Sequence, residues 1–311
     1  MAVGFISPDT KPRTRRRLVA GVAAAALVVL AGVVGVVGGG SSSTGAASTA
    51  QTVVANQSTS ANWAGYVNSG AQFSSVSGSW VVPAVTGPTS GYSAFWVGLG
   101  GASSTSQALE QVGTESDYVD GEASYVAWYE LVPAASQPLA LTIHPGDQVS
   151  AQVTVHGTTV TVSLADKTTG KAVTKTLQMP SPDTSSAEWI AETPSTAASG
   201  LQGEILPLAD FGTVDFTKAS ATAGGHTGSI TDSHWTAEQV DLGSPREVFR
   251  GPGPGYAGPP PPDSLPRDQA SAVATPSPLT SNGSAFSVSG QAVSAAGQGG
   301  MTPAVLPTAP G

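Results

Sequence analysis

Three strand-like stretches of the sequence place acid or amide side chains on one face, and in one of them a tryptophan lies two residues away on the same face. In an extended chain, residues two apart lie on the same face, so each stretch presents its polar groups together. The groups concerned are Glu188 and Glu192, Glu130 beside Trp128, and Gln111. A carboxylate can act as a general base, and an amide can donate to a developing oxyanion. These faces predict a cleft that binds an extended polymer, although a solvated sheet face would give the same pattern.

Other catalytic motifs are missing from the 311-residue sequence. It contains no cysteine, which excludes a thiolate nucleophile and cysteine-ligated metals. The Asp-Thr/Ser-Gly triplet, the Gly-x-Ser-x-Gly elbow and the His-Glu-x-x-His zinc motif do not occur. One Gly-x-Gly-x-x-Gly match at 253–258 is interrupted by prolines and lacks the strand and helix that a dinucleotide site requires. The sequence therefore predicts neither a cofactor nor a metal.

Charge is distributed unevenly along the chain. The formal net charge is −9, yet five of the 12 basic residues fall within the first 17 positions. The remainder is therefore strongly acidic, and it would repel the phosphates of nucleic acid. Because protonation of carboxylates relieves self-repulsion, such a surface suits an acidic medium.

An uncharged, apolar run at residues 18–39 follows this basic cluster. As a helix rising about 1.5 Å per residue, it can cross a bilayer core of roughly 30 Å. We expect residues 1–50 to comprise a cytoplasmic basic segment, a hydrophobic export helix that acts as signal peptide or signal anchor, and a Ser/Thr-rich linker. The domain beyond it should be secreted, or anchored outside the cytoplasm with this segment as its only membrane contact.

The rest of the chain shows a period of two residues, which is typical of strands. Apolar positions alternate with polar ones over 76–82, 149–155 and 160–164, and the last two runs flank a His-Gly turn. No amphipathic helix of normal length is predicted, so we expect an all-β domain, a large antiparallel sandwich. Its main part should cover residues 51–243. Residues 244–270 are predicted as a Pro/Gly-rich loop, 271–290 as the final strand, and 291–311 as a low-complexity tail.

Seven motifs, in this order, resemble those of the glutamic peptidases, or eqolisins. They are SANWAGYV (60–67), FSSVSGSWVVP (73–83), FWVGLGG (95–101), LEQVGTE (109–115), YVAWYELVP (125–133), SSAEWIAETPS (185–195) and ADFGTVDFT (209–217). The resemblance implies a concanavalin-like sandwich of two antiparallel sheets, with a concave face for substrate. It also implies an exported acid endopeptidase that acts on polypeptides, as a monomer and without a cofactor.

The resemblance assigns a role to six residues of this chain. Gln111 falls on the family's catalytic glutamine, and Glu188 falls on its catalytic glutamate. The positions that bind substrate or support the cleft are Trp63, Trp96, Trp128 and Glu130. Glutamate would act as general base and then as acid, with glutamine as the oxyanion donor.

Two alternatives stay open at the level of the sequence. A carbohydrate-binding or glycan-cleaving protein could use the same tryptophans and paired carboxylates. The second alternative is an inactive member of the family, because the chain departs from the family pattern in two places. Gly100 stands where an acidic residue is frequent, and the Pro-rich stretch interrupts the approach to the final strand, which we therefore expect to pair poorly.

Overall fold

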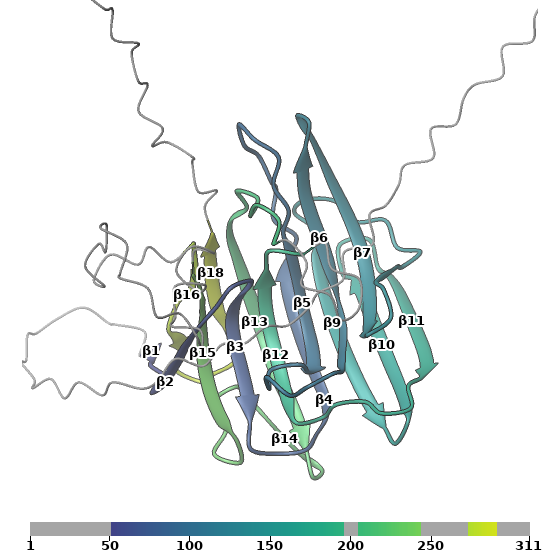
Figure 1. The fold of residues 1–311 in the computed structure, drawn as a ribbon, viewed down its shortest axis with the longest axis vertical. Coiled ribbons are helices and arrows are strands. Elements are labelled where there is room, and N and C mark those ends of the chain that lie inside the picture. The colour runs from purple at the N-terminus through teal and green to yellow at the C-terminus, as the bar shows by residue number, and fades with distance from the viewer. Residues whose placement is uncertain (1–50, 196–204, 244–272, 291–311) are drawn as a thin grey trace, which may run out of the picture.

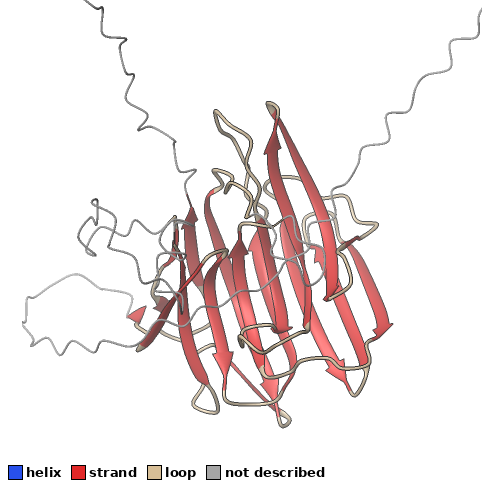
Figure 2. Ribbon diagram, in the orientation of Figure 1, coloured by secondary structure: helices blue, strands red, loops and turns tan. Residues whose placement is uncertain are grey.

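The computed structural model describes residues 51–195, 205–243 and 273–290. The predicted export segment, the Pro/Gly-rich loop and the C-terminal tail lie outside these residues. The described residues form strands, turns and loops (Figure 2). Within them, no helix is long and apolar enough to span a membrane.

One antiparallel sheet curls into two facing layers and confirms the predicted all-β sandwich (Figure 1). The first layer runs in the order β15 (Thr236–Leu242), β3 (Trp63–Ser69), β12 (Ser186–Glu192), β5 (Ala94–Gly100), β6 (Leu109–Val119), β7 (Glu122–Val132) and β8 (Gln137–Pro138). The second runs in the order β11 (Lys171–Gln178), β10 (Thr159–Asp166), β9 (Gln148–His156), β4 (Phe73–Val81) and β13 (Gly212–Ala223). The layers are joined through β18 (Phe286–Gly290) and β16 (Ala274–Pro276).

Short strands complete the architecture. β2 (Asn56–Ser60) pairs with β15 and is parallel to it, and β14 (His226–Gly228) forms a hairpin with β13. β1 (Gln51–Thr52) pairs with β17 (Leu279–Thr280) as a separate two-stranded sheet.

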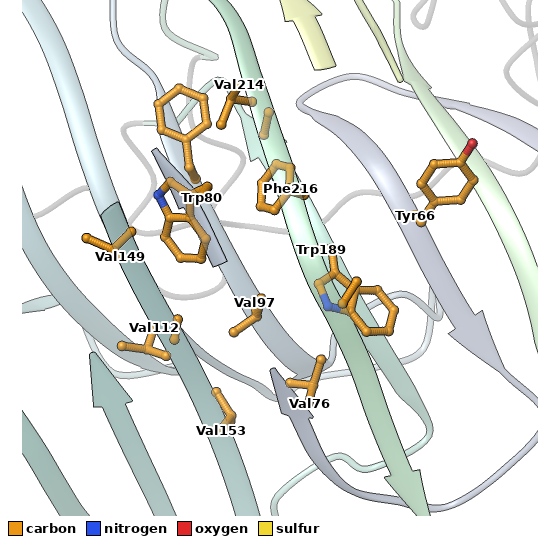
Figure 3. Close-up of a cluster of buried hydrophobic side chains, with 14 of the residues drawn as sticks. Tyr66, Val76, Trp80, Val97, Val112, Val149, Val153, Trp189, Val214 and Phe216 are labelled. Atoms are coloured by element: carbon orange, nitrogen blue, oxygen red, sulfur yellow. The ribbon is translucent and has the colours of Figure 1, made fainter. Parts of the chain in front are cut away.

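The core lies between the two layers, where β5 of one contacts β4 and β9 of the other. Alternation explains why: each strand sends every second side chain inward. Figure 3 shows Val97 and Trp189 from the first layer beside Val153 and Trp80 from the second, and all are buried. The Trp80 indole N–H donates to Thr114 Oγ1 across the layers at 2.9 Å, which satisfies a polar group that burial would otherwise leave without a partner.

The final strand pairs on both sides, contrary to the expectation that it would pair poorly. β18 is in register with β13 over five positions and also pairs with β16. Phe286 stacks on Phe216 with ring centroids 5.0 Å apart, and meets Tyr66 edge to face at 4.7 Å. These ring contacts anchor the strand at the junction of the layers, so the interrupted approach in the sequence does not weaken its pairing.

Candidate active site

The outer face of the first layer gathers the predicted site residues. In β12, Trp189 points into the core, so Glu188 and Ile190 lie on the opposite face. Register places Glu188 opposite Gly98 of β5, Gly98 opposite Gln111 of β6, and Gln111 opposite Glu130 of β7. One row across four strands therefore holds three of the predicted residues, although they come from distant parts of the sequence.

Gly98, in the middle of this row, has no side chain and so leaves room for the ring of Trp96. A Cβ atom there would lie 2.9 Å from Cζ3 of Trp96, so the indole ring lies over the glycine backbone. Trp96 belongs to the next row, together with Ile190 and Trp128. Since neighbouring strands are about 4.8 Å apart, the Cα atoms of Glu188 and Gln111 are separated by roughly 10 Å. The two side chains therefore lie on the same face, two strands apart.

The amide of Gln111 is held in one orientation. Its Nε2 donates to Oε2 of Glu130 at 2.7 Å, and its Oε1 has no hydrogen-bond partner. Nε2 carries two hydrogens, so one remains for another acceptor. A positioned amide with an unused N–H can stabilise a negatively charged oxygen.

Glu188 is fully buried, and neither of its carboxyl oxygens accepts a hydrogen bond. Burial raises the pKa of Glu188 well above its ordinary 4.5, and the carboxylates of Asp183 and Glu110 raise it further. The Ser186 hydroxyl lowers the pKa of Glu188, but this effect is smaller than the effect of burial, and the hydroxyl does not form a hydrogen bond with the carboxyl group. A carboxyl group with free lone pairs in a dry site is well placed to exchange a proton with a water or substrate.

The tryptophans form an aromatic wall beside this row. Trp63 and Trp96 meet edge to face, with centroids 5.1 Å apart. The Trp96 N–H donates to Glu192 at 2.8 Å, and Asn62 donates to the other oxygen of Glu192 at 2.9 Å. Burial raises the pKa of Glu192 to about 7, against the opposing effect of these hydrogen bonds. The Trp128 N–H has no acceptor, so it is available to a bound carbonyl group.

An acidic residue does stand beside Gly100, although the sequence lacks one at that position. Gly100 has φ +81°, and a Cβ there would lie 2.6 Å from both Cβ and the carbonyl oxygen of Asp183. The Asp183 carboxylate accepts hydrogen bonds from the Ser106 hydroxyl and from the Ser185 N–H. Burial raises the pKa of Asp183, but these hydrogen bonds outweigh it and leave the pKa below its usual value.

Sequence reasoning missed Asp183 and Glu110. The N–H of Asp183 donates to Oε1 of Glu110 at 3.1 Å, and burial raises the pKa of Glu110 to about 8. The charges of both residues raise the pKa of Glu188. The signals were present: a Ser-Pro-Asp turn precedes β12, and a glutamate occupies an inward position of β6.

The predicted dyad residues and Glu130 are buried on this face of the sheet. Gln111, Glu130 and Glu188 are each 0% exposed, so the alternative of a solvated sheet face is wrong. A cavity of about 880 Å³ adjoins the end of the row. It is lined by the loops 103–108 and 179–185 and by Val132 and Pro133, which follow Glu130 along the chain.

No potential metal ligands cluster at this face within the described residues. Among the described residues, one group of three possible metal ligands occurs, away from this face. It consists of His226, Asp232 and His234.

The curled sandwich and its row of buried carboxyl and amide groups define a class of protein, the glutamic-type endopeptidases. The chain belongs to the peptidase A4 family, whose model matches residues 61–243. It is 33% identical to aspergillopepsin-2 of Aspergillus niger over 205 residues, covering 57% of this chain and 70% of that protein. Scytalidopepsin B of Scytalidium lignicola is 32% identical over 183 residues, covering 57% of this chain and 69% of the relative.

Solved structures of the family have the same fold. Scytalido-glutamic peptidase, in complex with a transition-state analogue inhibitor, superposes with a TM-score of 0.59 at 27% identity. The match covers 74% of this chain and 98% of that one. SCP-B, an eqolisin in complex with the tripeptide Ala-Ile-His, gives a TM-score of 0.55 at 26% identity, with the same coverage.

Proposed function

We propose that this protein is an exported acid endopeptidase in which Glu188 and Gln111 form the catalytic dyad. The observation that carries the proposal is the single cross-strand row in which an unpaired buried carboxyl group faces an oriented amide across Gly98. Membership of the peptidase A4 family supports peptide bonds as the target. The relatives aspergillopepsin-2 and scytalidopepsin B support polypeptide substrates.

In the proposed reaction, the Glu188 carboxylate takes a proton from a water molecule, which attacks the carbonyl carbon of the scissile bond. The carbonyl oxygen becomes negatively charged and accepts the free N–H of Gln111, which Glu130 holds in place. Glu188 then returns its proton to the leaving nitrogen, the C–N bond breaks, and the original charge state is restored. No metal or cofactor is needed for these proton transfers.

The carboxyl groups around the dyad have opposing effects on the pH at which it would react. Glu188 must lose its proton to act as a base, and its raised pKa opposes this in acid, whereas protonation of Glu110 removes one of the charges that raise that pKa. Glu192 has a pKa raised by burial to about 7, and Glu110 one raised to about 8, so both stay neutral in acid. If they were ionised, they would place further negative charge near the developing oxyanion and oppose the reaction.

Substrate would enter beside the cavity at the end of the row. The cavity is lined by Val132, the last residue of β7, and by Ser185, which comes just before β12. Trp128 then offers its free N–H to the peptide backbone, and Trp63 and Trp96 provide an apolar wall. Gly100 does not argue for an inactive protein, because Asp183 supplies a carboxylate beside it.

The first prediction tests the base. Glu188→Gln should abolish casein hydrolysis by the purified protein at every pH between about 2 and 7, because an amide cannot accept the water proton. The substitution conserves shape, so the melting temperature should stay within a few degrees of that of the parent.

The matched control is Glu122→Gln, at an exposed position on β7, which should keep full activity. A well-folded Glu188→Gln protein that still cleaves casein would contradict the proposed dyad.

A further inference from the structure

A histidine–aspartate–histidine cluster lies at the hairpin between β13 and β14 and in the loop that follows it. Nε2 of His226 is 2.9 Å from Oδ2 of Asp232, and Nδ1 of His234 is 2.7 Å from Oδ1 of the same carboxylate. The two imidazole rings stack with centroids 3.8 Å apart and planes inclined by 28°. Each imidazole nitrogen thus contacts its own oxygen of one carboxylate, and the possible ligand atoms all lie within 4.8 Å of one another.

The backbone holds this arrangement from both sides, independently of the cluster. Ile230 is fully buried, and its N–H donates to the carbonyl of Gly283 at 3.0 Å. The Trp235 indole N–H donates to the carbonyls of Ser229 and Ile230 at 3.0 and 3.2 Å. Buried anchors therefore flank Asp232 and His234, so their backbone positions do not depend on a ligand.

Gly228 of β14 supplies the space that the carboxylate occupies. A Cβ atom at Gly228 would lie 2.2 Å from Oδ2 of Asp232, so only glycine fits there.

We propose that His226, Asp232 and His234 form a binding site for a divalent transition-metal ion, with Zn²⁺ as the best fit. Two imidazole nitrogens and one carboxylate are ligands that Zn²⁺ prefers, whereas Ca²⁺ and Mg²⁺ prefer oxygen alone. Bonds of about 2.0–2.1 Å to a tetrahedral ion place ligand atoms about 3.3 Å apart. To bind one ion, the nitrogens would have to move from the carboxylate by about half an ångström, and the stacked rings would have to turn so that both nitrogens point at the ion. Water would take the fourth position.

The position of the site indicates a structural role for the ion rather than a catalytic one. β14 pairs with β13 in the second layer, while the loop carrying Asp232 and His234 leads directly into β15 of the first layer. An ion here would link the two layers at one end of the sandwich. The dyad proposed above uses neither β13 nor β14, so this inference stands or fails separately from it.

The test uses the full chain without a polyhistidine tag, stripped with EDTA and titrated with Zn²⁺ near neutral pH by calorimetry. We expect one ion per chain and a rise in melting temperature with Zn²⁺. His226→Gln and His234→Gln should each weaken binding by at least tenfold, because each removes one of three protein ligands. The double variant should lose saturable binding.

His156→Gln is the matched control, since His156 is exposed on β9 and outside the cluster. It should bind Zn²⁺ as the parent does. Circular dichroism of each variant checks that the sandwich is intact, and a Co²⁺ spectrum typical of tetrahedral coordination gives a second readout. The proposal is overturned if the parent shows no saturable binding, or if the double variant binds as tightly as the parent. In either case the cluster is an aspartate-bridged histidine pair.

Discussion

Gln111 is the residue whose chemistry depends most on how its neighbours orient it. A free glutamine can offer an N–H or an oxygen to a substrate. Here the carboxylate of Glu130 accepts from Nε2, which leaves the second N–H of the same nitrogen as the group available for an oxyanion. An oxyanion donor acts mainly in the transition state, when the charge has moved onto oxygen.

Gln111→Ala should therefore lower kcat by about a hundredfold to a thousandfold with little change in KM. Kinetics on a fluorogenic peptide, together with the melting temperature of the same preparation, measures all three quantities. Gln148→Ala, at an exposed position on β9, is the control and should leave both constants unchanged. If kcat were unchanged in Gln111→Ala while the melting temperature fell, Gln111 would be a structural residue and the dyad would be wrong.

At the scale of elements, the end of β5 is shaped by the turn that precedes β12. Gly100 adopts φ +81°, a conformation that side chains rarely adopt, and Asp183 occupies the adjacent space. An acidic residue at this position would both strain the backbone and repel the Asp183 carboxylate.

Gly100→Asp should therefore lower stability by about 2 kcal/mol and should not raise activity. Gly121→Asp is a matched control, because Gly121 has a similar φ of +85° but no atom within 4 Å of an added Cβ. Chemical denaturation of both variants separates the strain of the positive φ from the clash with Asp183. A Gly100→Asp protein that is more active than the parent would show that Asp183 does not supply the missing carboxylate.

The strands that flank the Pro/Gly-rich segment are already paired. Leu242 at the end of β15 is in register with Ala274 of β16, and the N–H of Val273 donates to the Leu242 carbonyl at 2.8 Å. The two ends of the intervening segment are therefore held next to each other by the sandwich.

Deleting residues 246–268 should change the free energy of unfolding by no more than about 1 kcal/mol, because loop closure depends only weakly on loop length. Urea denaturation of the deleted and full chains gives this difference. A loss of several kcal/mol would mean that the segment contributes packing to the sandwich.

For the whole molecule, the buried carboxyl groups link stability to pH. Burial raises the pKa of Glu110 and Glu115 to about 8, and those of Glu192 and Asp117 to about 7. Unfolded carboxyl groups titrate near their ordinary values of about 4, so the folded state holds protons that the unfolded state releases. The stability that these four carboxyl groups contribute is therefore complete below about pH 4, and it is lost as the pH rises through their folded pKa values of 7 to 8.

The melting temperature should accordingly fall steadily between about pH 4.5 and pH 8, with a loss on the order of 3 kcal/mol from Glu192 alone. Glu192→Gln should flatten this dependence, because the amide oxygen can still accept from Trp96 and cannot ionise. Differential scanning calorimetry at stepped pH values measures both proteins. A melting temperature that is constant or rises over this interval would contradict the assignment of neutral carboxyl groups.

The sequence alone determined the strands and the side chains that share a face. Alternation of apolar and polar residues is a local property, so it predicted that Glu188 and Trp189 point in opposite directions and that Gln111 aligns with Gly113. The motif order then indicated the family and the two residues proposed as the dyad.

The tertiary structure decided which faces meet and how deeply they are buried. Strand order brings β12 next to β5 and β5 next to β6, and the fold brings Asp183 next to Gly100, across separations in sequence that no local pattern encodes. Register across two strand pairs aligns Glu188 with Gln111, and packing buries both side chains. Burial in turn raises the pKa values of the carboxyl groups, because desolvation depends on everything packed around a group and not on its neighbours along the chain.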